Sequence, residues 1–254
     1  MLAVLTLLAA TAGPVPEIDL ESVLIEAKQT LQSDLELWKH VQFRRDGYRE
    51  KLDEHDNVSW TLSFAMTVTA QDEGFDEELF EIEGRKPTER EVRKYRSDAK
   101  FTKHYKELLT GEVDHALMDE GLSMPAILEA GDYAFGGREE VQGVPCLRLD
   151  FQPGPEDSGE LVDRIADAIE GSLWLSEDGY HLVAWDTRLV RPLRKSIATI
   201  RLLELRVKAE PILGGWLATE IQLHSEVKLG PKMLRKRNRY RYSDFRELSR
   251  RGSH

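Results

Sequence analysis

Few residues of this sequence combine a type and a spacing that could do chemistry. The run Asp53-Glu54-His55-Asp56-Asn57 joins carboxylates and an imidazole, a composition that can bind a metal. Consecutive turn-forming residues of this kind are, however, typical of a solvated loop. His104 and His115 are too far apart to act as a helical ligand pair, and no H-E-x-x-H motif occurs. We therefore expect no metal site and no cofactor.

The sequence also lacks the motifs of a covalent or hydrolytic catalyst. It contains no G-x-S-x-G motif. Asp150, Asp186 and Glu220 are carboxylates on predicted strands, but no sequence feature brings them together. The single cysteine, Cys146, excludes an internal disulfide, and it lies in a strand pattern where a buried apolar role is more common than a reactive thiol. We expect a protein that is not an enzyme.

One basic cluster stands out on an acidic chain. The net charge is -11, yet residues 235–242 are rich in Arg and Lys with tyrosines between them. This pattern can indicate nucleic-acid binding, but the overall charge argues against it. On a strand, one face would carry Arg235, Arg237, Arg239 and Arg241. That face is either a solvated outer surface or a docking surface for an acidic partner or for lipid headgroups.

The N-terminal residues have the features of an export signal. Leu2–Ala9 is apolar, and Ala10-Thr11-Ala12 fits the A-x-A pattern of signal peptidase. The run is shorter than the roughly 20 apolar residues that span a bilayer. The sequence thus predicts a signal peptide over residues 1–12, a single domain over residues 13–254, and a soluble, exported protein.

Three helices are expected. Asp19 is a plausible N-cap for a helix whose apolar stripe runs from Leu20 to Trp38. Thr88 and Glu91 have capping-box spacing at the start of a second, strongly charged helix. A third apolar stripe extends from Leu161 to Ile169 and ends at Gly171.

The rest of the chain has the pattern of antiparallel strands. Apolar and polar residues alternate most clearly over Trp60–Val68, and the alternation returns in about ten segments. Turn signals lie at Gln142-Gly143, at Asp178-Gly179 and at Gly214-Gly215, the last in a loop expected to exceed two residues. Because helices and strands do not alternate, we expect one large, strongly curved antiparallel sheet.

Such a sheet has an apolar face that must be covered. A half-barrel with helices across its mouth is an economical solution. The inward positions would be Trp60, Leu62, Phe64, Met66, Leu147, Leu149, Phe151, Leu203, Leu217 and Ile221. They either fill a dry core or line a cavity for an apolar ligand, and the sequence leaves both possibilities open. Burial of about ten acyl methylenes would contribute roughly 8 kcal/mol before ordering costs.

Four sequence motifs carry a resemblance to a known family. In order, they are G-V-P-C-L-R-L-D-F-Q-P (Gly143–Pro153), G-S-L-W-L-S-E-D-G (Gly171–Gly179), G-G-W-L-A-T-E (Gly214–Glu220) and R-Y-R-Y-S-D-F-R (Arg239–Arg246). With the export signal and the first helix, the chain resembles the LolA-like outer-membrane lipoprotein-sorting proteins, in a divergent bacterial branch.

The resemblance implies a mainly β (α+β) fold, an unclosed antiparallel β-barrel of about ten strands with about three helices as a lid. It also implies a periplasmic, non-enzymatic carrier or chaperone that holds the acyl chains of lipoproteins or other lipids in an apolar cavity. We would then expect a monomer that serves lipoprotein sorting or envelope biogenesis, with an inner- or outer-membrane protein complex as a further partner. The alternative is an envelope sensor or regulatory binding module on the same fold, which recognises a lipoprotein or a protein partner.

Overall fold

The computed structural model describes residues 18–71, 74–93, 128, 131–153, 168–195 and 198–248. The predicted signal peptide, His104, His115 and most of the third predicted helix lie outside these ranges. In the described residues the chain forms one helix, α1 (Leu20–Trp38), a short helical turn over residues 89–93 and a large sheet.

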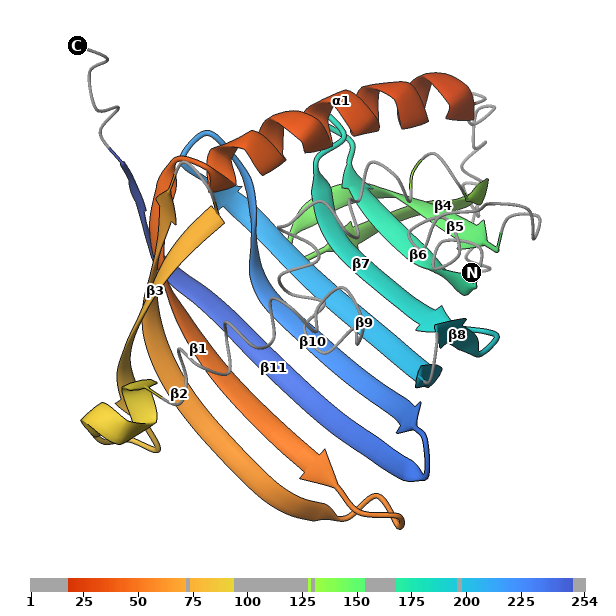
Figure 1. Cartoon of the computed structure of the whole chain (residues 1–254). Helices are drawn as coiled ribbons and strands as arrows, with labels where there is room; N and C mark the ends of the chain where they lie inside the picture. The colour runs from red at the N-terminus through yellow and green to blue at the C-terminus, as the bar shows by residue number, and fades with distance from the viewer. Residues whose placement is uncertain are drawn as a thin grey trace, which may run out of the picture.

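The strands form a single antiparallel sheet of 11 members (Figure 1). In chain order they are β1 (Val41–Leu52), β2 (Val58–Gln71), β3 (Gly74–Ile82), β4 (Asp132–Val141), β5 (Val144–Gln152), β6 (Ile169–Ser176), β7 (Leu182–Leu189), β8 (Leu193–Lys195), β9 (Ala198–Ile212), β10 (Gly215–Leu229) and β11 (Lys232–Glu247). Their order in the sheet is β3-β2-β1-β11-β10-β9-β7-β6-β5-β4, with β8 added to β9. Because this order has two ends, the sheet curls without closing, which confirms the predicted unclosed barrel.

Tight hairpins connect most neighbours, as the turn signals predict. Gln142 and Gly143 form the β4–β5 turn with φ values of 55° and 81°, the left-handed pair typical of a two-residue hairpin loop. The prediction of a longer loop around Gly214 is wrong. The β9–β10 turn is Leu213-Gly214 alone, with φ values of 54° and 84°. A leucine rarely adopts this conformation, so the sequence pattern placed the turn one residue too late.

The helix α1 begins where the capping signal predicts. The Asp19 carboxylate accepts a hydrogen bond from the Ser22 backbone N–H at 3.3 Å. The buried side of α1 carries Val23, Ala27, Leu31 and Trp38. Figure 1 shows the helix lying across one end of the curved sheet, so these residues cover part of its apolar face.

The second predicted helix also begins at its capping box. Thr88 Oγ1 accepts from the Glu91 backbone N–H at 3.3 Å, and Glu91 Oε2 accepts from the Thr88 backbone N–H at 2.8 Å. The predicted C-terminal end of the third helix is wrong. Ile169 does not continue a helix but opens β6, where it pairs with Leu189. An apolar stripe cannot show that a strand partner exists elsewhere in the chain.

One face of the sheet is apolar from β2 to β5. Cross-strand partners place a single row of residues on it: Phe64, Gly47, Tyr240, Ile221, Val207, Trp185, Leu173 and Leu149. All of them are buried. We call this face, which also meets the apolar side of α1, the concave face. Residues between these positions point to the outer face.

The glycine at position 171 permits a close approach between β6 and β7. A Cβ atom at Gly171 would lie 2.0 Å from the Asp186 carbonyl oxygen and 2.8 Å from the Thr187 Cα atom on β7. Because backbone atoms cannot swing aside, we expect Gly171→Ala to lower the free energy of unfolding by about 2–3 kcal/mol in urea titrations. The control, Ser172→Ala, loses one hydrogen bond to Asp150 and should cost about 1 kcal/mol. Equal costs for the two variants would contradict this packing.

Candidate ligand-binding site

The structure brings the ten predicted ligand-binding residues together on the concave face. Eight are buried, with exposed fractions between 0% and 6%: Phe64, Met66, Leu147, Leu149, Phe151, Leu203, Leu217 and Ile221. Leu62 is half-buried, and Trp60, near the β1–β2 hairpin, is 50% exposed. The period-two pattern therefore identified the inward face, but it overstated the burial of Trp60 and Leu62 at the start of β2.

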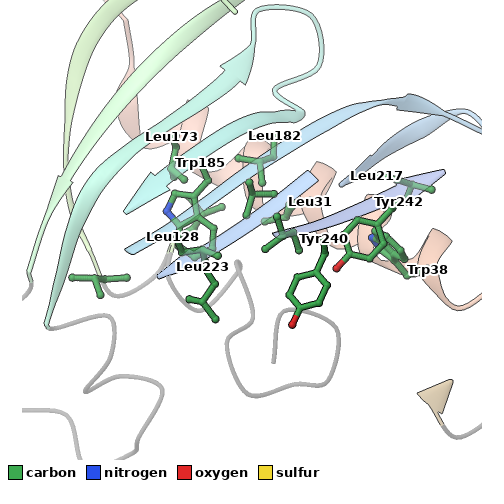
Figure 2. Close-up of a cluster of buried hydrophobic side chains, with 14 of the residues drawn as sticks. Leu31, Trp38, Leu128, Leu173, Leu182, Trp185, Leu217, Leu223, Tyr240 and Tyr242 are labelled. Carbon is green, nitrogen blue, oxygen red and sulfur yellow. The ribbon is translucent and has the colours of Figure 1, made fainter. Parts of the chain in front are cut away.

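These residues are packed in this structure. The eight buried residues belong to one hydrophobic cluster that also includes Leu31 and Trp38 of α1. Figure 2 shows part of this cluster, with Leu31, Trp38 and Leu217 among its labelled residues. In the part of the chain that the structure describes, a pocket of about 610 Å³ lies beside β3 and another of about 540 Å³ lies beside the β6–β7 turn, and none of the ten residues lines either of them. A ligand can reach the eight buried residues only if the side chains that cover them move aside.

A buried carboxylate fastens α1 to the sheet. Asp34 is 4% exposed. Its Oδ1 atom accepts the Trp216 backbone N–H at 3.0 Å, and its Oδ2 atom lies 2.7 Å from His181 Nδ1. Thr30 Oγ1 donates to the Gly179 carbonyl at 2.9 Å. We call these contacts the α1 anchor, because they join the helix to the β6–β7 and β9–β10 turns.

Close approach of the chains makes the α1 anchor compact. A Cβ atom at Gly215 would lie 2.3 Å from Leu37 Cδ1 and 2.7 Å from Asp34 Oδ1. A larger residue at this position would require the Leu37 and Asp34 side chains to shift. The Gly214-Gly215 pair that the sequence presents as a turn signal therefore has a second role, which is to let α1 reach the sheet.

The pair of Asp34 and His181 resembles part of a hydrolytic triad, and Ser176 is close in sequence. The Ser176 hydroxyl, however, donates to the Asp178 carbonyl at 2.7 Å and accepts the His181 backbone N–H at 3.0 Å. His181 also stacks on Trp216, with ring centroids 5.9 Å apart. Since both Asp34 oxygens and the serine hydroxyl are engaged in holding turns and helix, the arrangement acts as a structural fastening.

The sequence contains a signal for the α1 anchor that was not among the predicted site residues. Ala27, Leu31 and Trp38 form the buried stripe of α1, and Asp34 occupies a position on the same stripe. A carboxylate on an apolar stripe must find hydrogen-bond donors when the helix packs. His181, two residues after the Asp178-Gly179 turn, could not be named as its partner without the fold.

An ion pair inside the concave face was also not predicted. Arg45 is 2% exposed, and its Nη2 atom lies 2.8 Å from Glu77 Oε1 and 2.8 Å from Met66 Sδ. Arg45 continues the inward series of Val41 and Phe43 on β1. Burial of such a charge is costly unless it is paired, which the Glu77 carboxylate achieves.

The predicted basic strand is β11, and its arginines project outward as expected. Arg235 Nε lies 2.7 Å from Glu226 Oε2, and Arg239 and Arg241 lie 3.5 Å and 3.8 Å from Glu220. The outer face thus carries a ladder of ion pairs with β10, each worth little in water. Asn238, Tyr240 and Tyr242 face inward and are buried. Partner binding by this surface remains a prediction.

The acidic run at residues 53–57 and Cys146, which the sequence offers as possible chemical groups, have structural roles. Asp53 Oδ1 accepts the backbone N–H groups of His55 and Asn57 at 2.8 Å and 2.9 Å, so the acidic run is a hydrogen-bonded loop. Within the described residues no group of three or more His, Cys, Asp or Glu could hold a metal ion. Cys146 is buried, and this burial raises the pKa of its thiol.

The predicted strand carboxylates lie apart on the outer face. Asp150 accepts the Ser172 hydroxyl at 2.6 Å, and Asp186 pairs with Arg206 at 2.9 Å. Glu220 faces the arginines of β11. No described helix has the length and apolar character needed to cross a membrane.

No model of a protein family matches this chain, and neither does any curated protein. Solved structures that it is similar to include a DUF1329 family protein from Desulfovibrio piger, at 13% identity, with 92% of this chain and 94% of that chain covered and a TM-score of 0.38. A LolA superfamily protein from Nitrosomonas europaea has 10% identity, the same coverage of 92% and 94%, and a TM-score of 0.35. A domain named for outer-membrane lipoprotein sorting, from Vibrio parahaemolyticus, has 14% identity, coverage of 92% and 94%, and a TM-score of 0.39.

Two of these solved structures have names of the kind of protein that the sequence resembles.

The α1 anchor predicts a specific loss of stability. Asp34→Ala leaves the partly buried Trp216 N–H without its acceptor and removes the partner of His181. We expect the free energy of unfolding to fall by about 2–3 kcal/mol. The control, Glu36→Ala, removes an exposed contact with Lys39 on the same helix and should cost less than about 0.5 kcal/mol. Similar urea midpoints for both variants would contradict a structural role for Asp34.

Proposed function

We propose that this protein is a non-enzymatic, periplasmic carrier or chaperone that binds the acyl chains of lipoproteins or other lipids on its concave face. The observation that carries the proposal is an apolar surface on a sheet that does not close, with a helix fastened across one end. Since β3 and β4 are not paired with each other in the sheet order, the gap between them can widen without breaking a strand ladder.

The free energy gained by burying an acyl chain is large enough to release α1 from the sheet. The α1 anchor consists of three polar contacts, those of Asp34 with Trp216 and His181 and that of Thr30 with Gly179. At about 1 kcal/mol each they hold the helix by roughly 3 kcal/mol. Ten acyl methylenes contribute about 8 kcal/mol gross. The ligand can therefore offset the loss of these contacts and part of the apolar packing of α1.

Binding of a fluorescent fatty acid to delipidated protein tests the proposal. Leu203 points into the concave face and is 6% exposed. We expect Leu203→Glu, which adds a buried charge, and Leu203→Trp, which fills space, each to weaken binding at least tenfold. Leu213→Glu makes the same chemical change at a turn residue that is 44% exposed and should bind as wild type does. Circular dichroism verifies that each variant is folded.

If wild-type protein does not bind the probe, or if all folded variants bind it equally well, the carrier proposal is wrong.

The outer arginines supply a place for the carrier to meet a membrane. We propose that β11 docks on an anionic lipid surface, since Arg239 and Arg241 have half or more of their side chains exposed, at 50% and 64%. Exchange of Arg237 and Arg239 for Glu should abolish sedimentation with vesicles that contain anionic phospholipid. Arg206→Glu, at an exposed position on the outer face of β9, is the control. Unchanged sedimentation of the double variant would remove this idea.

A further inference from the structure

One buried polar atom in the middle of the concave face has no hydrogen-bond partner in the part of the chain that the structure describes. Trp185 on β7 is 2% exposed, and its indole Nε1 atom is buried without an acceptor. Figure 2 shows this side chain within the apolar cluster that also holds Leu173 and Leu223. Because roughly 90% or more of buried polar groups in proteins are paired, the unpaired donor requires an explanation.

The cross-strand neighbours of Trp185 are apolar and uncharged. They are Leu173 on β6 and Val207 on β9, and both are buried. Thr187, two residues further along β7, is also buried, and its hydroxyl donates to the Glu170 carbonyl at 2.8 Å. The Nε1–H group of Trp185 is therefore a neutral donor on an apolar surface.

A water molecule is a poor partner for this donor. A buried water typically makes about three hydrogen bonds to protein groups that would otherwise lack a partner. The cross-strand partners of Trp185 supply only aliphatic side chains, and the Thr187 hydroxyl already donates to Glu170. A water that accepts from Nε1 would have poor acceptors for its own hydrogens. A ligand oxygen that only accepts is satisfied by the indole donor alone.

The apolar surroundings also favour one class of acceptor. A carboxylate or a phosphate at this place would lose its hydration, and neither cross-strand partner of Trp185 carries a cation to offset that loss. An amide carbonyl is neutral, but the amide N–H would need an acceptor of its own. An ester is neutral and has only acceptor atoms. Its carbonyl oxygen is thus the group that this donor fits best.

The concave face provides room along β9 for the chain of such an ester. Val207, Leu205 and Leu203 occupy successive inward positions of β9, and all three belong to the hydrophobic cluster. From Val207 to Leu203 the strand extends about 13 Å at about 3.3 Å per residue. One leaflet of a bilayer contributes about 15 Å of hydrocarbon, so most of an acyl chain is matched by this length.

The unpaired donor also gives the protein a reason to exchange its packed state for a ligand-bound one. A ligand shifts an equilibrium between two states only by its difference in affinity for them. In the packed state Trp185 Nε1 is buried without an acceptor, which is unfavourable. A bound ester pairs the same atom. The ester therefore contributes a stabilising contact that the packed side chains do not.

We propose that the indole N–H of Trp185 binds the carbonyl oxygen of an acyl ester whose hydrocarbon chain lies along β9, past Leu205 and Leu203. The inference rests on the proposed carrier function and names the linkage in its ligand. The protein then prefers an O-acyl lipid to an alkyl ether of the same length.

A matched pair of uncharged lipids tests the inference: monopalmitoylglycerol, an ester, and hexadecylglycerol, the ether with the same number of chain carbons. One net hydrogen bond corresponds to roughly three- to tenfold in affinity. We expect wild-type protein to bind the ester about fivefold more tightly than the ether. Trp185→Phe keeps an aromatic ring and removes the donor, so this ratio should fall below about twofold. The ratio is the readout because the smaller ring affects the packing of both lipids alike.

Two control variants should retain the full ratio. Trp174→Phe makes the same exchange on β6, where the Trp174 Nε1 atom donates to Glu139. Asn238→Leu changes another buried side chain of the concave face, whose Oδ1 atom is also without a partner among the described residues. Circular dichroism verifies that each variant is folded. A loss of the ratio in Asn238→Leu but not in Trp185→Phe would overturn the assignment to Trp185.

Nuclear magnetic resonance of the indole N–H groups supplies a readout that a merely structural role would not move. The sequence contains five tryptophans, so the spectrum has few indole signals to assign. The Trp185 signal of wild-type protein should move downfield when the ester binds and should move much less when the ether binds. Since this measurement uses wild-type protein, it decides the question even if Trp185→Phe does not fold.

The outcomes separate the two proposals. Equal affinity of wild-type protein for ester and ether, a ratio that survives in folded Trp185→Phe, or a Trp185 signal that both lipids move equally overturns the ester site and leaves the carrier function standing. If neither lipid binds wild-type protein, both proposals fail.

Discussion

The structure depends on one constraint: a curled sheet that does not close must cover its apolar face with something other than itself. Eleven antiparallel strands place Phe64, Ile221, Trp185 and Leu149 on one continuous surface, and the two ends of the strand order never meet. Such a surface is unstable in water unless side chains from elsewhere pack on it. The helix α1 supplies part of this cover, and Leu31 and Trp38 enter the same cluster as the strand residues. A covering element that is separate from the sheet can move away from it, whereas the wall of a closed barrel cannot.

Polar contacts hold α1 on the sheet, and further polar contacts lie along the concave face. At the α1 end, the buried Asp34 carboxylate joins the helix to two turns, so a few hydrogen bonds fix the position of an amphipathic helix of 19 residues. In the middle of the face, Arg45 is neutralised by Glu77. At the far end, Arg49 is held between Phe64 and Tyr240. The concave face thus has an apolar end under a fastened helix, whereas its inward positions toward the hairpins include Arg49 and Lys51.

Much of the fold could be predicted from the sequence, because the alternation of apolar residues over β2, β5 and β11 is a local property. Local patterns also located α1, the β4–β5 turn and the outward arginines. They failed where the outcome depends on distant partners. Ile169 was assigned to a helix, since its pairing with Leu189 is invisible in a local pattern. Asp34, Arg45 and Arg49 were missed because a single polar residue on an apolar stripe acquires its meaning only when register brings His181, Glu77 or Tyr240 beside it.

The central claim is that the concave face holds an acyl chain, and the most direct measurement is native mass spectrometry of the protein purified from bacterial cells without detergent. We predict a mass increment equal to one lipid on a substantial fraction of the molecules, with the lipid identified after organic extraction. Protein that carries no lipid as purified, and that takes up none during incubation with phospholipid vesicles, would contradict this claim. The concave face would then be a permanently filled core.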